Sequence, residues 1–523
     1  MSVLLIILAA AAAGMGLARR LKLPLAPLLI LSGVAVSALG LVNDPDLFQE
    51  ALFMGLAFLV FSAGTEMNPA RVGRQGKAAV SVGLAQLLAL ALIGGGLAWL
   101  LGFAWLEALY LALALAASST LVVIRLLKQR QQLFEPFGRL VVGVLLAQDM
   151  VIILAIAALS HIEEGATAVF ISINGTLGLI LLARLSLQWL SPWLLLRLDL
   201  DDEEKLLAAL AILFLFIGAA NLIGVPLVIG AFLAGIALSV FPVSGILRGQ
   251  LASLSDFFLA IFFVTLGSSL TLPTWGDLLL ALLLAAVVIL VTPPLVYLIA
   301  RRAGLTARSG WEGGLLLAQT SEFSLIVALI GVQQGHVGQQ LLSIIAMVTV
   351  LTMIATPFLA TDRNSIWLLH RLTRRKAPLA PSPPAGHVLL LGCGEHGLAL
   401  LERLRAWGTR VVVVDEDAAV AARVAQMGVT ALQGAAADPR VLAAAGAAQA
   451  RVIVSTLRRM VDNEAVLRQA GATPVLVAVF APEAAAQVEA LGGTAVVESH
   501  VAAEAFMDWF AAREGQAPGR PPA

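Results

Sequence analysis

The chain has 523 residues, of which 60% are hydrophobic and only 13% are charged, whereas soluble domains are roughly a quarter charged. This balance excludes a soluble globular protein and a disordered one, and it indicates a membrane protein. Thirty-three basic residues balance thirty-three acidic ones, so the net charge gives no reason to expect a nucleic-acid partner. The single cysteine excludes disulfides within the chain and sites that need several thiolates.

Apolar runs that can cross a bilayer core of roughly 30 Å occur about thirteen times before residue 362. Their length of about 20 residues, without the alternation of a β-barrel strand, predicts an α-helical polytopic membrane domain over residues 1–362. The runs lie near residues 2–17, 24–41, 47–64, 77–101, 105–127, 137–159, 165–187, 205–223, 226–241, 252–272, 277–300, 310–332 and 340–360.

Basic residues fall in alternate loops, beginning with Arg19, Arg20 and Lys22 after the first run. The intervening loops, such as 43–50 and 161–164, contain no lysine or arginine. By the positive-inside rule, the N-terminus lies outside and the C-terminal part lies in the cytoplasm. This topology requires an odd number of membrane helices.

Two polar breaks interrupt apolar runs that are seven segments apart. The first contains Ser119 and Thr120, and the second contains Gln319 and Glu322. Discontinuous helices at corresponding places in two halves are typical of the midplane site of an inverted-repeat transporter, and the odd offset makes the repeats antiparallel. Each break alone has another explanation, because Ser and Thr often bond to carbonyls of their own helix. Glu322 is either a second titrating group or a structural acid bonded across the repeat.

Asp149 is the ionisable residue placed farthest from any helix end. It lies about midway along the run 137–159, with the amide of Gln148 beside it. Charges at the membrane midplane are costly, so they mark function by default. One carboxylate can hold either a proton or a monovalent cation, but not both at once. The alternative is an aspartate that bonds neighbouring helices for structure alone.

The composition changes after residue 362. The segment 363–386 is basic and then proline-rich, which fits a membrane-surface anchor followed by a stiff linker. A soluble domain is expected over 387–512, and a Gly/Pro-rich flexible tail over 513–523.

The soluble domain begins with an apolar strand that runs into the pattern GxGxxG, followed by a helical stretch and a second strand that ends in an acid. Such glycines allow a diphosphate to approach a helix N-terminus, and an acid about 20 residues on can bond ribose hydroxyls. We expect a Rossmann-like α/β domain that binds NAD(H) or an adenine mononucleotide (AMP or ATP) as a regulatory ligand; the alternative is an empty Rossmann fold. Cys393 in the loop is either a redox sensor or a small filler. The expected ligand contacts are Gly392, Gly394, Glu395, His396, Gly397, Asp415 and Thr456.

Several motifs in order along the chain resemble the cation:proton antiporter-2 family. They are Ala117–Lys128, Gln148–Asp149, Gly230–Ser239, Phe262–Gly267 and Gln319–Phe323. The single Gln-Asp pair is most similar to Kef-type potassium:proton antiporters, and residues 387–512 resemble the TrkA-N domain, the N-terminal lobe of the domain that regulates potassium conductance (RCK).

The resemblance implies a homodimer with a thirteen-helix inverted-repeat fold and crossed discontinuous helices in a bacterial inner membrane. It implies that Asp149 accepts the proton and the cation, which is the only metal expected, among Gln148, Ser119, Thr120 and Gln319. Two positions depart from the family pattern. The eleventh run reads Thr292-Pro293-Pro294 where many relatives carry a base, and the family's Gly-Asp-Ala appears as 434–436, Gly-Ala-Ala.

The function expected from these features is exchange of K⁺, favoured over Na⁺, for H⁺, electroneutral and regulated by nucleotide. A nucleotide-regulated potassium channel or efflux pathway is disfavoured, because the chain has no Thr-Val-Gly-Tyr-Gly filter. A membrane-anchored NAD-dependent oxidoreductase is also disfavoured, because the remaining length is membrane helix and leaves no substrate domain. We therefore expect a transporter and no enzyme.

Overall fold

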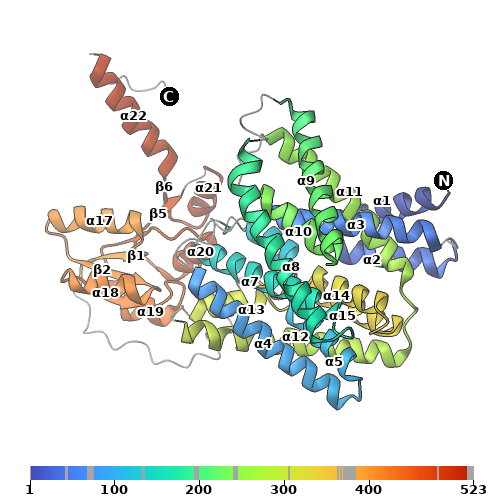
Figure 1. Cartoon of the computed structure of the whole chain (residues 1–523). Coiled ribbons are helices and arrows are strands. Elements are labelled where there is room, and N and C mark those ends of the chain that lie inside the picture. The colour runs from blue at the N-terminus through green and yellow to red at the C-terminus, as the bar shows by residue number, and fades with distance from the viewer. Residues whose placement is uncertain are drawn as a thin grey trace. The chain divides into compact units, whose positions relative to one another are not determined.

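The computed structural model describes residues 2–41, 45–66, 76–130, 132–133, 136–193, 200–239, 245–303, 307–361, 364–365, 368, 385–479 and 482–514. The chain forms two compact units, Met1–Leu369 and His370–Ala523. The first is a bundle of helices and the second contains a sheet with helices around it (Figure 1).

Every one of the thirteen apolar runs overlaps at least one helix of the first unit. Within the described residues, nine helical spans are long and apolar enough to cross a membrane, which confirms a polytopic helical protein; a total of thirteen crossings stays a prediction. The helices are α1 (Ser2–Leu21), α2 (Leu25–Ala38), α3 (Pro45–Glu66), α4 (Gly76–Leu100), α5 (Trp105–Ala116), α6 (Thr120–Gln129), α7 (Pro136–Leu159), α8 (Ala166–Leu185), α9 (Asp202–Ile223), α10 (Leu227–Leu238), α11 (Gly245–Ser269), α12 (Trp275–Arg302), α13 (Ala307–Leu316), α14 (Glu322–Gln333) and α15 (Gln339–Leu359).

The packing of these helices shows an internal repeat. Helix α2 packs on α11, and α10 packs on α3; α4 packs on α5 and α7, and α12 packs on α13 and α15. When α5–α6 and α13–α14 each count as one segment, exchanging every segment with the one seven places away turns the pair α2–α11 into α10–α3. The same exchange turns the contacts of α4 with α5 and α7 into those of α12 with α13 and α15. The odd offset makes the two halves antiparallel, which is the arrangement predicted from the polar breaks.

Glycines at two helix crossings obey the same repeat. A Cβ added to Gly33 of α2 would lie 2.1 Å from the carbonyl oxygen of Val264, and one added to Gly235 of α10 would lie 2.2 Å from that of Phe61. Nearly the same spacing along the chain separates Gly33 from Gly235 and Phe61 from Val264. The reciprocal contacts join Gly267 to Ile30 and Gly64 to Phe232. Both crossings therefore depend on backbone approaches that only glycine permits.

We expect Gly235→Ala to destabilise the membrane unit by about 1–3 kcal/mol, the usual cost of overpacking. The added methyl group would meet backbone atoms of α3, which cannot rotate away as a side chain can. The matched control is Gly218→Ala in α9, where an added Cβ meets nothing within 4 Å. Thermal unfolding in detergent checks this: Gly235→Ala should melt lower and Gly218→Ala should not, and equal midpoints would contradict the packing argument.

The helices separate into two sets, which we name by position. The scaffold group comprises α1, α2, α3, α9, α10 and α11, and the core group comprises α4 to α7 and α12 to α15. Helix α8 packs on α7 of the core group and on α9 and α10 of the scaffold group. The groups also meet where the rings of Phe232 and Phe323 form an edge-to-face pair, with centroids 5.8 Å apart.

The second unit is built on a six-stranded parallel sheet in the order β3-β2-β1-β4-β5-β6. The residues of β1 are all buried; Leu389 and Leu391 pack into one hydrophobic cluster and Leu390 into another, so both faces of the sheet are covered. The chain reverses its strand order between β1 and β4, where open parallel sheets bind ligands. The strands are β1 (Val388–Leu391), β2 (Val411–Asp415), β3 (Thr430–Gln433), β4 (Val452–Ser455), β5 (Val475–Val479) and β6 (Thr494–Val497).

This unit is the predicted Rossmann-like domain. Its helices are α17 (Glu395–Ala406), α18 (Ala418–Gln426), α19 (Pro439–Ala444), α20 (Met460–Gln469), α21 (Pro482–Ala490) and α22 (Glu498–Glu514). The last of these extends away from the sheet as a single helix (Figure 1).

Candidate ion-binding and nucleotide-binding sites

Two membrane helices are discontinuous at the predicted polar breaks. Helix α5 ends at Ala116 and α6 begins at Thr120, capped by Ser119, whose Oγ accepts the Val122 N–H at 3.2 Å. Helix α13 ends before the second break, and α14 is capped in the same way by Ser321. Serine side chains satisfy backbone donors that a helix start leaves open, so a break of this kind is stable inside an apolar bundle.

Hydrogen bonds join the two breaks to each other. The Oγ of Ser118 donates to the carbonyl of Leu317 at 2.9 Å, and the Oγ of Ser324 donates to the carbonyl of Ala114. Ser118 also accepts from Gln86 Nε2 at 3.3 Å, and its backbone N–H donates to Gln148 Oε1 at 3.4 Å. Ser118 thus bonds to α4, to α7 and to the second break. Sequence reasoning missed this role, and its only signal was the position of Ser118 in the first break.

Asp149 is fully buried on α7, beside the start of α6. Thr120 Oγ1 donates to its Oδ2 at 2.9 Å, while its Oδ1 has no hydrogen-bond partner among the described residues. The Nε2 of Gln148 and the Oε1 of Gln319 lack partners in the same part of the chain. Buried polar atoms are nearly always paired, so the two open oxygens are suited to a proton, a cation or water, and the amide N–H of Gln148 is suited to a water or another acceptor.

Glu322 is bound to the same break as Asp149. Its Oε1 accepts from Ser119 Oγ at 2.7 Å, and it is the first residue of α14, where the helix dipole favours a negative charge. The neighbouring residues Ser119 and Thr120 therefore each hold one carboxyl group. The carboxyl groups of Asp149 and Glu322 also interact electrostatically. Glu322 is bonded across the repeat, as one of its two predicted roles requires.

The second half of the repeat has hydroxyl groups where the first half has an acid. Thr320 Oγ1 donates to Thr349 Oγ1 at 3.0 Å, and its backbone N–H donates to Thr352 Oγ1 at 3.2 Å. Both partners lie on α15, which corresponds to α7 in the repeat. On α12, Thr292 is buried and is followed by Pro293 and a second proline. Helix α12 has no base before Arg301, so its middle part offers no charge partner to Asp149.

The phosphate loop of the second unit has the glycine geometry that its pattern predicts. Gly392 has a φ of +83°, and a Cβ on Gly397 would lie 2.3 Å from the Gly392 carbonyl oxygen. The Oγ1 of Thr456 donates to that same carbonyl at 3.0 Å. A Cβ on Gly394, by contrast, would meet nothing within 4 Å, and α17 starts beside it without a side-chain cap. The space over Gly394 and the open helix N-terminus fit a phosphate group.

Asp415 ends β2 and faces the phosphate loop. Its Oδ2 accepts the Cys393 N–H at 2.7 Å, and its Oδ1 accepts the Asp417 N–H at 2.8 Å. Each carboxylate oxygen has a further lone pair, so the group can still accept a ribose hydroxyl. Burial and the nearby Asp415 carboxylate raise the pKa of the Cys393 thiol. The thiol therefore stays protonated, which favours a filler over a redox sensor.

Two other predicted contacts lie less directly on the loop. The side chain of His396 is 63% exposed and lies 3.3 Å from Glu498, the first residue of α22. The side chain of Glu395 lies outside the described part of the structure. Asp438, the acid nearest to the missing Gly-Asp-Ala motif, caps α19 and bonds the guanidinium of Arg440 at 2.8 Å. It serves α19 and not the loop.

Family models match both units of the chain. Residues 4–361 match the model "Sodium/hydrogen exchanger, transmembrane", and residues 388–499 match the TrkA-N domain. The chain belongs to the sodium/hydrogen exchanger family and carries a C-terminal TrkA-N domain. The prediction of a cation:proton antiporter of this kind is confirmed at that level.

Three solved structures match parts of the chain, and the first of them shows the fold of the membrane unit. The sodium proton antiporter MjNhaP1 from Methanocaldococcus jannaschii is 16% identical, with a TM-score of 0.54, and the match covers 71% of this chain and 100% of that one. The TrkA-N domain of the inner membrane protein ybaL from Escherichia coli is 21% identical, with a TM-score of 0.23, over 24% of this chain and 97% of that one. The GsuK channel bound to NAD is 20% identical, with a TM-score of 0.24, over 44% of this chain and 43% of that one.

Proposed function

We propose that the protein exchanges one monovalent cation for one proton at Asp149. The observation that supports this is a buried carboxyl group with one bonded and one open oxygen, set where two discontinuous helices are hydrogen-bonded together. A cation displaces the proton from Asp149 and a proton displaces the cation, so the carboxyl group never holds both at once. The backbone groups freed at the breaks line the path of the ion.

Gln148, Ser119, Thr120, Gln319 and Glu322 shape this site. Thr120 orients the Asp149 carboxyl group, Ser119 binds Glu322 as a neighbouring acid, and the two amides offer open polar atoms. With one carboxylate per cycle, exchange is electroneutral. The similarity of the Gln-Asp pair to Kef-type antiporters supports K⁺ over Na⁺. The protein acts as a homodimer in a bacterial inner membrane, with its N-terminus outside and the TrkA-N domain in the cytoplasm.

Reconstitution into liposomes tests this function. An outward K⁺ gradient should drive proton uptake that a pH dye inside the vesicles reports, and a Na⁺ gradient should drive it more slowly. The rate should be the same at zero voltage and at an imposed voltage. Proton flux driven by voltage alone would overturn electroneutral exchange. Glu322 would then be the candidate carrier of a second proton in each cycle.

Nucleotide binding at the phosphate loop of the TrkA-N domain regulates this exchange. The open space at Gly394 and the free acceptor capacity of Asp415 support NAD(H) or an adenine mononucleotide as the ligand. A ligand regulates only if it binds the active and inhibited conformations with different affinity. Gly392, Gly397 and Thr456 pack closely together in this loop, which supports it as the nucleotide site.

We expect Gly394→Val to weaken nucleotide binding roughly tenfold or more, which corresponds to about 1.4 kcal/mol, because its side chain occupies the phosphate space. The fold should tolerate it, because a Cβ there meets no protein atom within 4 Å. Gly397→Ala is the contrasting control: its Cβ would clash with the loop, so it should lower stability without any ligand. Calorimetry of the full chain with NAD, AMP and ATP checks both, and unchanged affinity in Gly394→Val would remove the loop as the site.

A further inference from the structure

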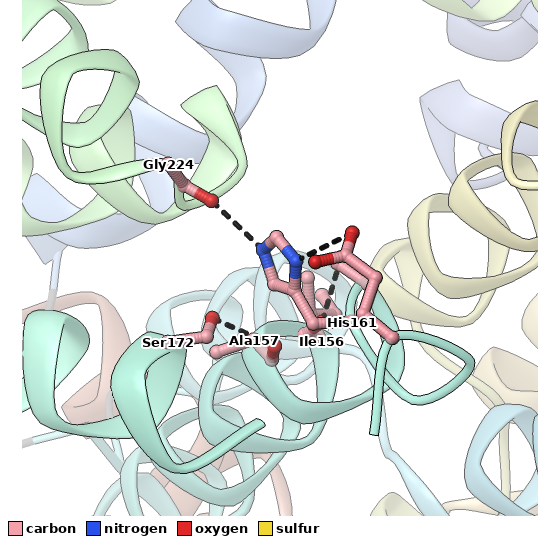
Figure 2. Close-up of polar contacts among 7 residues, drawn as sticks. Ile156, Ala157, His161, Ser172 and Gly224 are labelled. Carbon is pink, nitrogen blue, oxygen red and sulfur yellow. Dashed lines mark hydrogen bonds and ion pairs between the residues drawn. The ribbon is translucent and has the colours of Figure 1, made fainter. Parts of the chain in front are cut away.

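His161 lies between two hydrogen-bond acceptors at the end of the helix that carries Asp149. It follows α7 by two residues, in the turn that leads to α8. Its Nδ1 is 3.1 Å from Oε1 of Glu164, and its Nε2 is 2.8 Å from the carbonyl oxygen of Gly224 (Figure 2). The side chain is 22% exposed, so it can exchange protons with water.

The two partners decide which form of His161 fits. A carbonyl oxygen and a carboxylate oxygen only accept hydrogen bonds, and a neutral imidazole carries a single N–H. The neutral ring can therefore satisfy Gly224 or Glu164 but leaves a lone pair facing the other. The imidazolium has two N–H groups and satisfies both. Histidine is the side chain that changes between these forms from roughly pH 5 to 8.

The turn around His161 moves with α7. The Oγ of Ser160 donates to the carbonyl of Ile156 at 2.8 Å, and the Oγ of Ser172 on α8 donates to the carbonyl of Ala157 at 2.8 Å (Figure 2). These bonds fix the start of the turn and the start of α8 on the last turns of α7. Any displacement of α7 therefore displaces the imidazole.

The other end of the bond belongs to the scaffold group. Gly224 caps α9 with a φ of +80°, and α10 begins three residues later. The bond from His161 to Gly224 thus joins α7 of the core group to the turn between α9 and α10 of the scaffold group. Alternating access requires one helix group to move against the other around the ion site. A bond between the groups resists that movement.

Two further charged groups beside this turn belong to the core group. Glu163, in the same turn as His161, lies 3.6 Å from Nε2 of His336, whose Nδ1 is 2.9 Å from the hydroxyl of Tyr110. The turn 221–227 of the scaffold group contains no ionisable residue. The loop 161–164 carries no lysine or arginine, so the topology proposed above places this face outside.

We propose that His161 is a proton-dependent bridge between the core and scaffold groups, and that its protonation slows exchange. Protonation completes the second hydrogen bond and stabilises the conformation described here, so the bridge is strong at acid pH and weak once the ring is neutral. His161 is a positioning residue, because it acts through α7 and does not touch the ion. This inference rests on the proposed exchange function.

The test is cation exchange by the full-length protein in liposomes, measured as isotope counterflow at equal pH on both sides so that protein orientation does not matter. His161→Gln keeps a donor for Gly224 but cannot become charged. At about pH 6 it should exchange roughly three- to tenfold faster than the wild type, on the scale of one charge-assisted hydrogen bond, and the two rates should converge at alkaline pH. His161→Lys stays charged and should be slow across the range.

The matched control is His336→Gln, on the same face but with both partners in the core group; its pH profile should follow the wild type. Identical profiles for the wild type and His161→Gln would overturn the bridge, as would the same change in His336→Gln. If His161→Gln expresses poorly, thermal unfolding provides a second readout: acidification should raise the melting temperature of the wild type more than that of His161→Lys. Absence of exchange in the wild type at any pH would instead count against the proposed function.

Discussion

Asp149→Asn is expected to reduce cation:proton exchange to the level of empty liposomes while the protein stays folded. The amide keeps an oxygen that can accept from Thr120, but it binds no proton and offers no charge to a cation. Removing a buried carboxylate also removes its desolvation cost, so the free energy of unfolding should not fall. Cation-driven pH recovery measures the exchange, and size-exclusion chromatography with thermal unfolding measures the fold.

The matched control for this substitution is Asp256→Asn. Asp256 is an aspartate on α11 that is exposed and far along the chain from both breaks. Its amide variant should exchange at the wild-type rate. Exchange that survives in Asp149→Asn, or that is lost equally in Asp256→Asn, would falsify the assignment of Asp149.

Deletion of the chain from residue 377 onward is expected to abolish the response to nucleotide and to leave exchange intact. Residues 1–369 form a compact unit, and the breaks, Asp149 and their hydrogen bonds all lie within it. The phosphate loop lies in the other unit, so its loss removes the regulatory site. Transport with and without NAD, AMP or ATP measures the effect.

Full-length Gly394→Val serves as the control for this deletion, because it removes the nucleotide and keeps the chain. It should reproduce the loss of response. A truncated protein that folds but does not exchange would make the TrkA-N domain an obligatory part of the cycle. A truncated protein that still responds to nucleotide would place the regulatory site in the membrane unit.

The sequence was sufficient for the parts of this molecule that depend on local pattern. Polar residues inside apolar runs predicted both discontinuous helices, and the midplane position of Asp149 predicted the candidate ion site. The order of strand, GxGxxG and terminal acid predicted the Rossmann-like domain. In each case the physical cause lies within a few residues, such as the capping of α6 by Ser119.

Contacts between distant segments could not be predicted in this way. Ser118 joins residues of α4, α7 and the second break, and nothing in its own neighbourhood distinguishes it from the hydroxyl beside it. The close approach of Gly33 to Val264 depends on how α2 crosses α11. No local pattern marks His161, because its partner Gly224 lies between two other helices.

If one carboxyl group holds the proton and the cation in turn, cation binding must release a proton. Calorimetric titration of the detergent-solubilised protein with K⁺ or Na⁺, repeated in buffers of different ionisation enthalpy, counts the protons released. The wild type should release about one proton per cation bound, as competition for a single carboxylate requires, and Asp149→Asn should release none. Cation binding without proton release, or release that persists in Asp149→Asn, would contradict competition at this carboxylate.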